Sequence, residues 1–186
     1  MMAIMSQLFG EVAGAYHEAR PGYPAEIVAA IRAYHGGTPD RLVEVGAGTG
    51  LATGTLLGLG APTTCVEPDH RMARALGERF PQVEVVTAAF ESADPQRQGD
   101  LPDGWFHDDI AGSGLFTDVR APLFCRELPL DTAAYLRLVG TFSPQLRRPP
   151  ALRERVLTAV GAAIDGFGGT VVLDLRTTLV LARRPA

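Results

Sequence analysis

Residues 42–51 are Leu42-Val43-Glu44-Val45-Gly46-Ala47-Gly48-Thr49-Gly50-Leu51, and this stretch decides the fold. A short apolar run is followed by glycines at every second position, after which apolar residues resume at helical spacing. The pattern predicts a buried parallel strand, a tight turn and a helix. Because glycine has no Cβ, a ligand can approach the backbone of such a turn, and the next helix offers free N–H groups in its first turn. The stretch therefore predicts a nucleotide-type binding turn.

The composition is that of a globular protein. The chain has 186 residues, 46% of them apolar and 20% charged, which suits one domain with a sizeable core. Its formal net charge of -4 and the lack of a basic run argue against nucleic acid or an anionic membrane as the main partner. All 17 Lys or Arg positions are Arg, and Asn is absent. This bias indicates a GC-rich bacterial source.

Targeting signals and metal-ligand patterns are not evident in the sequence. The first ten residues have neither the charged start nor the apolar core of a signal peptide, and no segment approaches the length of a membrane span. We therefore expect a cytoplasmic protein. Cys65 and Cys125 lie in apolar runs, so we expect two buried, reduced thiols. The four histidines show no metal-ligand spacing, and no metal site is expected.

Strands and helices are expected to alternate in the first half of the chain. The predicted strands are 42–45, 62–66, 83–90, 116–128 and 170–182, and the predicted helices are 25–35, 51–59, 70–80, 105–115, 131–138 and one from residue 150. Asp69 and Asp131 are expected to cap the helices that follow them. The β-α-β-α-β order predicts a parallel sheet with right-handed crossovers.

The N-terminal segment 9–24 carries Tyr16 and the run Arg20-Pro21-Gly22-Tyr23-Pro24. Two prolines and a glycine forbid one continuous helix there. An aromatic, Arg-bearing segment of this kind can fold over a ligand as a lid. It can equally be a packed N-terminal arm, and the residues alone leave both interpretations open.

The glycine spacing discriminates between nucleotides. A dinucleotide fingerprint is Gly-x-Gly-x-x-Gly, whereas here the third glycine comes one residue early and Glu44 stands two residues before the first. A carboxylate at that position would repel a pyrophosphate and attract an α-ammonium group through a charge-assisted hydrogen bond. S-adenosyl-L-methionine has such an ammonium and no phosphate, so it is the expected cofactor.

Further candidate contacts follow the second and third predicted strands. Glu67 is placed to accept both ribose hydroxyls, because a carboxylate has paired acceptor oxygens. With that role alone, Glu67→Ala should weaken cofactor binding and leave the thermal midpoint nearly unchanged. Ala89 and Phe90 would supply an apolar wall and a backbone donor to an adenine ring.

These residues carry a family resemblance. The run from Glu44 to Gly50 resembles the first motif of class I S-adenosylmethionine-dependent methyltransferases, and Glu67 falls where that family keeps its ribose acid. Tyr16 and residues 20–24 resemble the branch called methyltransferase type 11, in which this arm closes over the cofactor. Residues 104–183 also look like the tail of that branch.

The resemblance implies an α/β fold: a Rossmann-like three-layer sandwich with a mostly parallel, shortened sheet and a C-terminal antiparallel hairpin. It implies one domain over residues 1–186, made of an N-terminal arm and helix (1–37), a cofactor-binding half (38–92) and a C-terminal half (104–186). The cofactor-binding residues that it implies are Tyr16, Arg20, Glu44, Gly46, Ala47, Gly48, Gly50, Glu67, Pro68, Ala89 and Phe90.

The chain departs from the family after Glu91. Up to residue 115 it offers no run of four apolar residues, so the fourth and fifth strands of the family have no counterpart. The outer edge of the first strand would then lack a neighbour, and such an edge invites association. We expect either that the final hairpin pairs with the first strand, giving the order 3-2-1-7-6, or that a second chain covers this edge in a homodimer.

The leading functional hypothesis is S-adenosylmethionine-dependent methyl transfer to a small-molecule acceptor. A truncated, non-catalytic module that binds S-adenosylmethionine or S-adenosylhomocysteine is the alternative, and an NAD-dependent oxidoreductase is a further one. Methyl transfer depends mostly on positioning, so few catalytic side chains are required. If a base is needed, His17 and His107 are the candidates.

Overall fold

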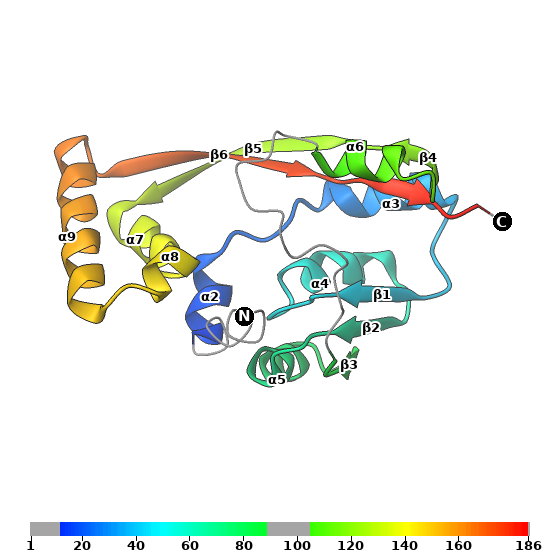
Figure 1. The fold of residues 1–186 in the computed structure, drawn as a ribbon, viewed down its shortest axis with the longest axis horizontal. Coiled ribbons are helices and arrows are strands. Elements are labelled where there is room, and N and C mark those ends of the chain that lie inside the picture. The colour runs from blue at the N-terminus through cyan, green and yellow to red at the C-terminus, as the bar shows by residue number, and fades with distance from the viewer. Residues whose placement is uncertain (1–11, 89–104, 186) are drawn as a thin grey trace.

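A computed structural model of the protein describes residues 12–88 and 105–185, and a parallel sheet forms its centre (Figure 1). The strands are β1 (Leu42–Val45), β2 (Thr63–Val66) and β3 (Glu84–Val86), in the order β1-β2-β3. Both pairings are parallel, with Val45 beside Val66 and Val66 beside Val86. The predicted α/β class with a parallel sheet is confirmed. The third strand is shorter than predicted, and Ala89 and Phe90 lie outside the described residues.

Two crossover helices cover one face of this sheet. Helix α4 (Leu51–Leu56), continued by the 3-10 turn η1 (Leu57–Leu59), joins β1 to β2, and α5 (His70–Arg79) joins β2 to β3. Both connections step in the same direction along the sheet, and right-handed crossovers then place both helices on the same side. Leu59, Leu76 and Cys65 are fully buried there. On the opposite face Val43 and Val45 are 57% and 52% exposed.

Local signals set the ends of the early helices. The arm contains α2 (Ala13–Ala19), which stops before Pro21, and α3 (Glu26–His35) ends at Gly36 with φ of 89°. Asp69 caps α5 as predicted, because its Oδ1 accepts hydrogen bonds from the backbone N–H of Arg71 at 2.9 Å. Helix α2 packs against α5, and α3 packs on α4 and η1.

The C-terminal part begins with α6 (Trp105–Gly112) and is dominated by a long two-stranded ribbon (Figure 1). Strand β4 (Thr117–Arg120) pairs with β7 (Leu181–Arg183), and β5 (Leu123–Asp131) pairs with β6 (Thr170–Thr178), all antiparallel. The predicted strands 116–128 and 170–182 are each interrupted, the first at Pro122, which has no N–H to donate. The N–H of Leu179 donates to the Pro122 carbonyl at 3.0 Å and holds the two interruptions together.

The ribbon is not a simple hairpin, because three helices connect its long strands. These are α7 (Thr132–Gly140), α8 (Ser143–Leu146) and α9 (Pro150–Gly166). Asp131 caps α7 as predicted, with its Oδ1 accepting from the N–H of Ala134 at 2.7 Å. Within residues 12–88 and 105–185, no helix is long and apolar enough to cross a membrane.

The prediction that the final strands pair with β1 is wrong. Among the described strands, β1 pairs with β2 alone, and the strands of the ribbon form separate sheets. The ribbon instead packs on the helix layer, where Thr177 and Leu179 line a small pocket together with Ala52 and Leu56 of α4. Figure 1 shows α3 and α4 between β1 and the ribbon. The other expectation, a second chain at the β1 edge, stays a prediction.

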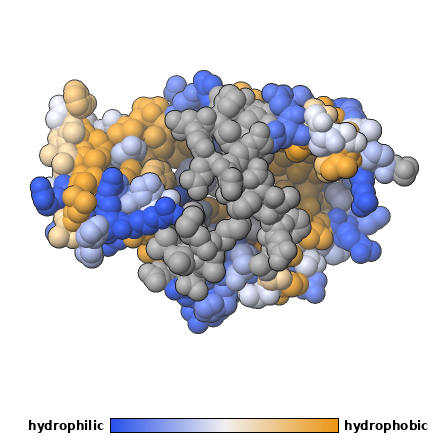
Figure 2. Space-filling view, viewed as in Figure 1, coloured by the Kyte–Doolittle hydropathy of each residue, from blue (hydrophilic) through white to orange (hydrophobic). Residues whose placement is uncertain are grey.

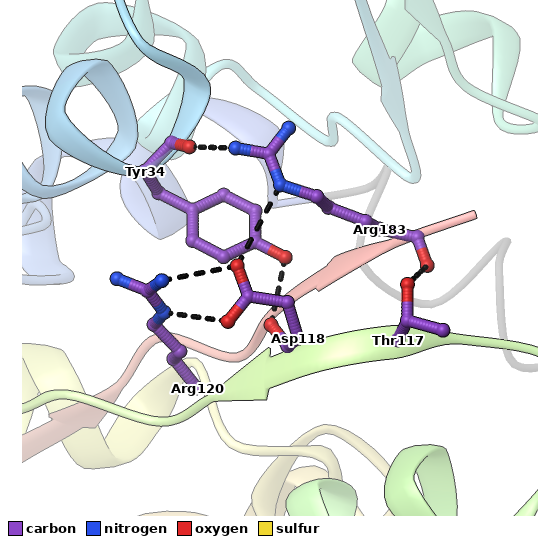
Figure 3. Close-up of polar contacts among 5 residues, drawn as sticks. All are labelled: Tyr34, Thr117, Asp118, Arg120 and Arg183. Atoms are coloured by element: carbon purple, nitrogen blue, oxygen red, sulfur yellow. Dashed lines mark hydrogen bonds and ion pairs between the residues drawn. The ribbon is translucent and has the colours of Figure 1, made fainter. Parts of the chain in front are cut away.

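A polar cluster ties α3 to the end of the ribbon (Figure 3). The Tyr34 hydroxyl donates to the Asp118 carbonyl at 2.8 Å, and Arg183 donates to the Tyr34 carbonyl. The Asp118 carboxylate accepts from Arg120 at 2.9 and 3.0 Å and pairs with Arg183 at 3.6 Å. The hydrogen bond from Arg120, with the charges of both arginines, lowers the pKa of Asp118. The C-terminal ribbon is thus held to the N-terminal half by side chains and not by strand pairing.

The two cysteines differ in environment. Cys65 is buried in the sheet core, as predicted, whereas Cys125 is exposed and both are free thiols. Cys125 lies on β5, where alternate side chains point away from the protein. The expectation of a buried Cys125 is therefore wrong, because an apolar run does not reveal which face of a two-stranded ribbon is covered.

Candidate functional site

The turn between β1 and α4 presents bare backbone to space that no described residue fills. Gly46 and Gly48 have φ values of 72° and 59°, in the left-handed region that glycine adopts without strain. The N–H groups of Gly46 and Ala47 donate to the Val66 carbonyl at 2.8 and 3.2 Å, which fixes the turn over the end of β2. Among the described residues, a Cβ added at Gly46 would meet nothing within 4 Å, and one at Gly48 would meet only Met72 Sδ at 3.9 Å. A ligand can therefore reach the backbone here.

Two residues predicted to bind the cofactor are packed in the core. Gly50 caps α4 with φ of 89°, and an added Cβ would lie 2.5 Å from Phe80 Cε2 and 2.6 Å from Leu76 Cδ1. Ala47 is 6% exposed and packs with Cys65 and Leu76. Both residues are packed on the core side of the turn, so only their backbone groups can face a ligand.

Glu67 connects the turn after β1 with the turn after β2. Its side chain follows β2 and is almost entirely buried, with the residue 6% exposed. Oε2 accepts from the Gly48 N–H at 2.7 Å, and Oε1 accepts from the Asp69 N–H at 2.9 Å, across Pro68. Hydrogen bonds to a charged acceptor are the stronger kind. Each carboxylate oxygen keeps a second lone pair, so Glu67 can still accept from a ligand hydroxyl.

Glu44 lies beneath α4. The Thr53 hydroxyl donates to Glu44 Oε2 at 2.7 Å, and Cys65 Sγ lies 3.9 Å from the same oxygen. Burial raises the pKa of Glu44 because it disfavours the charged form, and the hydrogen bonds from Thr53 and Cys65 offset this only in part. The carboxylate predicted to meet an ammonium group is thus half-buried on the strand that leads into Gly46.

Glu44→Gln is expected to raise the thermal midpoint at neutral pH by a few degrees. A folded-state pKa above the unfolded value of 4.5 means that the Glu44 carboxyl stabilises the fold below that value and loses this contribution as pH rises through the folded pKa. The glutamine oxygen can still accept from Thr53. The gain over wild type, measured by thermal unfolding between about pH 4 and pH 7, should therefore shrink as pH falls.

Thr53→Val is the matched control, because it removes the donor and leaves the Glu44 carboxylate in place. It should lower the midpoint. A lower midpoint for Glu44→Gln at neutral pH would contradict the inferred cost of the buried charge.

The arm contributes His17 to the glycine turn. Its Nδ1 lies 3.1 Å from the hydroxyl of Thr49, which is 1% exposed. Burial, followed by the positive charge of Arg79, lowers the pKa of His17. Both effects favour the neutral imidazole, which is the form able to accept a proton.

Tyr16 and Arg20 pack against the C-terminal helices. The Arg20 guanidinium lies 4.5 Å from the Tyr16 ring centre and 5.3 Å from that of Phe142. Arg20 Nε also donates to the Thr141 hydroxyl at 3.4 Å. Since α2 contacts α5 and α7, the structure favours the packed-arm interpretation, in which His17 contacts the turn at Thr49.

His107, the other candidate base, lies elsewhere. It is on α6, where its Nδ1 lies 3.0 Å from Asp108 Oδ1, and α6 packs beside β4. Figure 1 places α6 along the ribbon and not at the carboxyl end of β1. The described geometry thus brings His17 to the turn and leaves His107 apart.

Two contacts were missed by the sequence reasoning. Thr49 and Thr53 are fully buried. Thr49 forms a hydrogen bond with His17 of the arm, and Thr53 donates one to Glu44. The sequence gives only a weak signal for these two contacts. Each residue is a small hydroxyl residue near the glycines, at a position whose side chain must point toward the sheet. Only the packing of α2 and α4 reveals their partners.

Comparison with known proteins gives partial matches. Over 92 residues the chain is 34% identical to uncharacterized methyltransferases of Mycobacterium bovis and Mycobacterium tuberculosis. The match covers 47% of this chain and 35% of each relative, so the chain spans about a third of their length in the aligned region. No protein-family model matches the chain. The sequence similarity supports a methyltransferase fold for the aligned part.

Two solved structures also resemble the chain in part. One is described provisionally as an RNA methyltransferase from Pyrococcus horikoshii, with 18% identity, a TM-score of 0.40, and coverage of 56% of this chain and 74% of that one. The other is described provisionally as a sarcosine dimethylglycine methyltransferase from Galdieria sulphuraria, with 10% identity, a TM-score of 0.39, and coverage of 86% and 85%.

Proposed function

We propose that this chain binds S-adenosyl-L-methionine at the glycine turn and transfers its methyl group to a small-molecule acceptor. The observation that carries the proposal is the open backbone at Gly46 and Gly48, next to the buried carboxylate of Glu67. A positive-φ glycine pair with free space above it, beside an acid at the end of the next strand, suits a nucleoside ligand. The similarity to curated methyltransferases supports the same conclusion.

The residues at the turn fit such a cofactor. Glu67 would accept its ribose hydroxyls, and the backbone at Gly46 and Gly48 would lie against it. Glu44, two residues before the turn, would favour its ammonium group over a pyrophosphate. These assignments also make the NAD-dependent alternative the weaker one.

Methyl transfer requires mainly that the acceptor is positioned against the methyl group and that water is excluded. When bound, the sulfonium of the cofactor supplies an electrophilic methyl group. The chain must orient the acceptor and exclude water from the turn. The arm can exclude water there because His17 contacts Thr49. A neutral His17 can also take a proton from an acceptor hydroxyl or amine.

A non-catalytic binding module is the second candidate. The observation that favours it is the outer edge of β1, where the described residues supply no neighbouring strand, while Val43 and Val45 on the sheet face opposite the helices are exposed. In a doubly wound sheet, strands on that side complete the ligand crevice. A module that binds and does not transfer would retain the turn without this wall.

Calorimetry followed by an assay separates these functions. S-adenosylmethionine, S-adenosylhomocysteine and NAD are titrated into the protein, and transfer of a labelled methyl group is then measured over a panel of small molecules. Binding of the first two with transfer supports the methyltransferase. Binding without transfer supports the module, and binding of NAD alone overturns both.

Gly48→Ala is expected to weaken cofactor binding at least about tenfold, because its Cβ would point into the ligand space. The matched control is Gly60→Ala, since Gly60 has a similar positive φ of 74° and open surroundings at the end of η1. Both variants should lose about 1 kcal/mol of stability from backbone strain. Calorimetry should show lost affinity for Gly48→Ala alone, and unchanged affinity would refute the assigned pose.

A further inference from the structure

Helix α9 leaves one face uncovered at the far end of the molecule (Figure 1). Its inner side packs on α7, where Gly161 is buried and an added Cβ would lie 3.1 Å from Leu136 Cδ1. The described residues that line the hollow along its outer side all belong to α9, between Leu152 and Ala162. Figure 2 shows hydrophobic residues gathered over α9 at the left-hand end. Among the described residues, nothing covers this face.

The outer face carries an apolar stripe. Five residues, spaced by four, three, four and four positions, form this stripe. We call it the outer stripe, and it consists of Leu152, Val156, Ala159, Ala163 and Phe167. Leu152 is 44% exposed and Phe167 is 91% exposed. Apolar residues at this spacing form the contact line of paired helices. Aromatic residues, phenylalanine included, are enriched at protein interfaces relative to the rest of the surface.

The outer stripe is complementary to itself when two copies run antiparallel. About a two-fold axis between positions 159 and 160, Leu152 of one copy lies opposite the exposed Phe167 of the other, and Val156 lies opposite Ala163. Leu152 and Phe167 then form an apolar contact at each end, and the small Ala163 opposite Val156 lets the helices approach between these contacts. A parallel arrangement would put Phe167 against Phe167 and alanines against alanines.

Charge favours the same orientation. The N-terminal end of α9 and the loop before it carry four arginines and one glutamate: Arg147, Arg148, Arg153, Arg155 and Glu154. The C-terminal end carries Asp165 and lies beside Asp131, and these carboxylates also accept hydrogen bonds from the Thr132 hydroxyl and the Ala134 N–H of α7, respectively. The helix dipole adds partial charges of the same sign at each end. Antiparallel packing therefore sets a basic end beside an acidic end twice.

We propose that α9 is a self-association surface, through which two copies of this chain pack their outer stripes antiparallel. A helix of 17 residues is about 25 Å long. A single pair of such helices falls short of the roughly 800 Å² per partner of a standard interface. The dimer is accordingly weak, dissociates on dilution and weakens with added salt. The glycine turn takes no part in it, so the dimer does not depend on the proposed function.

Sedimentation velocity over a range of protein concentrations and two salt concentrations tests the association. Phe167→Ser should weaken the dimer about tenfold or more, and its monomer should remain folded because the side chain is 91% exposed. Leu115→Ser is the matched control, since Leu115 is 68% exposed on the segment between α6 and β4. It should leave the dimer unchanged.

Cross-linking tests the orientation in a Cys125→Ser background, which removes the exposed native thiol. A mixture of Leu152→Cys and Phe167→Cys proteins should form the mixed disulfide dimer under mild oxidation, while each protein alone should form little. Preferred dimers of each protein with itself would show parallel packing and overturn the proposal. A monomer at every concentration would also overturn it, as would a dimer insensitive to Phe167→Ser but lost with Val45→Lys, which would place the interface at the β1 edge.

Discussion

Gly50→Ala is expected to lower the free energy of unfolding by about 2–4 kcal/mol, because the added Cβ meets closer contacts here than at any other described glycine. Two costs add. The residue has φ of 89°, where an L side chain is strained, and the new Cβ would lie 2.5 Å from Phe80 and 2.6 Å from Leu76. Those side chains belong to the core of the sheet unit, so they cannot move aside without opening a void.

Urea denaturation measures the loss, and Gly36→Ala is its matched control. Gly36 has the same φ of 89°, and no atom of the described residues lies within 4 Å of an added Cβ, so it reports the backbone strain alone. Its loss should be about 1 kcal/mol. Equal losses for the two variants would mean that the contact with α5 does not restrain the glycine turn.

Glu67→Ala is expected to lower the free energy of unfolding by about 2–4 kcal/mol and also to abolish cofactor binding. The carboxylate accepts from the N–H groups of Gly48 and Asp69, and its removal leaves both donors without this partner in a region that is largely buried. An unpaired buried N–H group costs about 1–3 kcal/mol. The structure thus changes the sequence-based expectation, which gave Glu67 a ligand role and no effect on the thermal midpoint.

Glu84→Ala is the matched control for Glu67→Ala. Glu84 is an exposed acid on β3 that accepts one hydrogen bond from the Thr64 hydroxyl at 2.8 Å, so its loss should cost under about 0.5 kcal/mol. Thermal unfolding and calorimetry are run on both variants. Lost binding with an unchanged midpoint for Glu67→Ala would return Glu67 to a purely ligand-binding role.

Local chemistry explains which predictions were accurate. The glycine turn, the caps of α5 and α7 and the end of α3 depend on residues a few positions apart, such as Asp69 with Arg71. The parallel order of β1, β2 and β3 follows from short crossovers of one hand. In these cases the chain leaves few alternatives to the conformation that the structure shows.

Long-range packing explains the failures. Whether the ribbon would pair with β1 or pack on α3 and α4 depended on side chains over a hundred residues apart, such as Tyr34 and Arg183. The exposure of Cys125 depended on which face of the ribbon met those helices. No periodicity in the sequence encodes either outcome.

The candidate site divides in the same way. The backbone of the turn and the identity of its acids are properties of the sequence, because only glycine adopts positive φ without strain and only a carboxylate can serve paired donors. The roles of those acids were decided by the fold, which put Glu44 beneath Thr53 and tied Glu67 to two N–H groups. A side chain's partner depends on what packs against it, and that is a property of the tertiary structure.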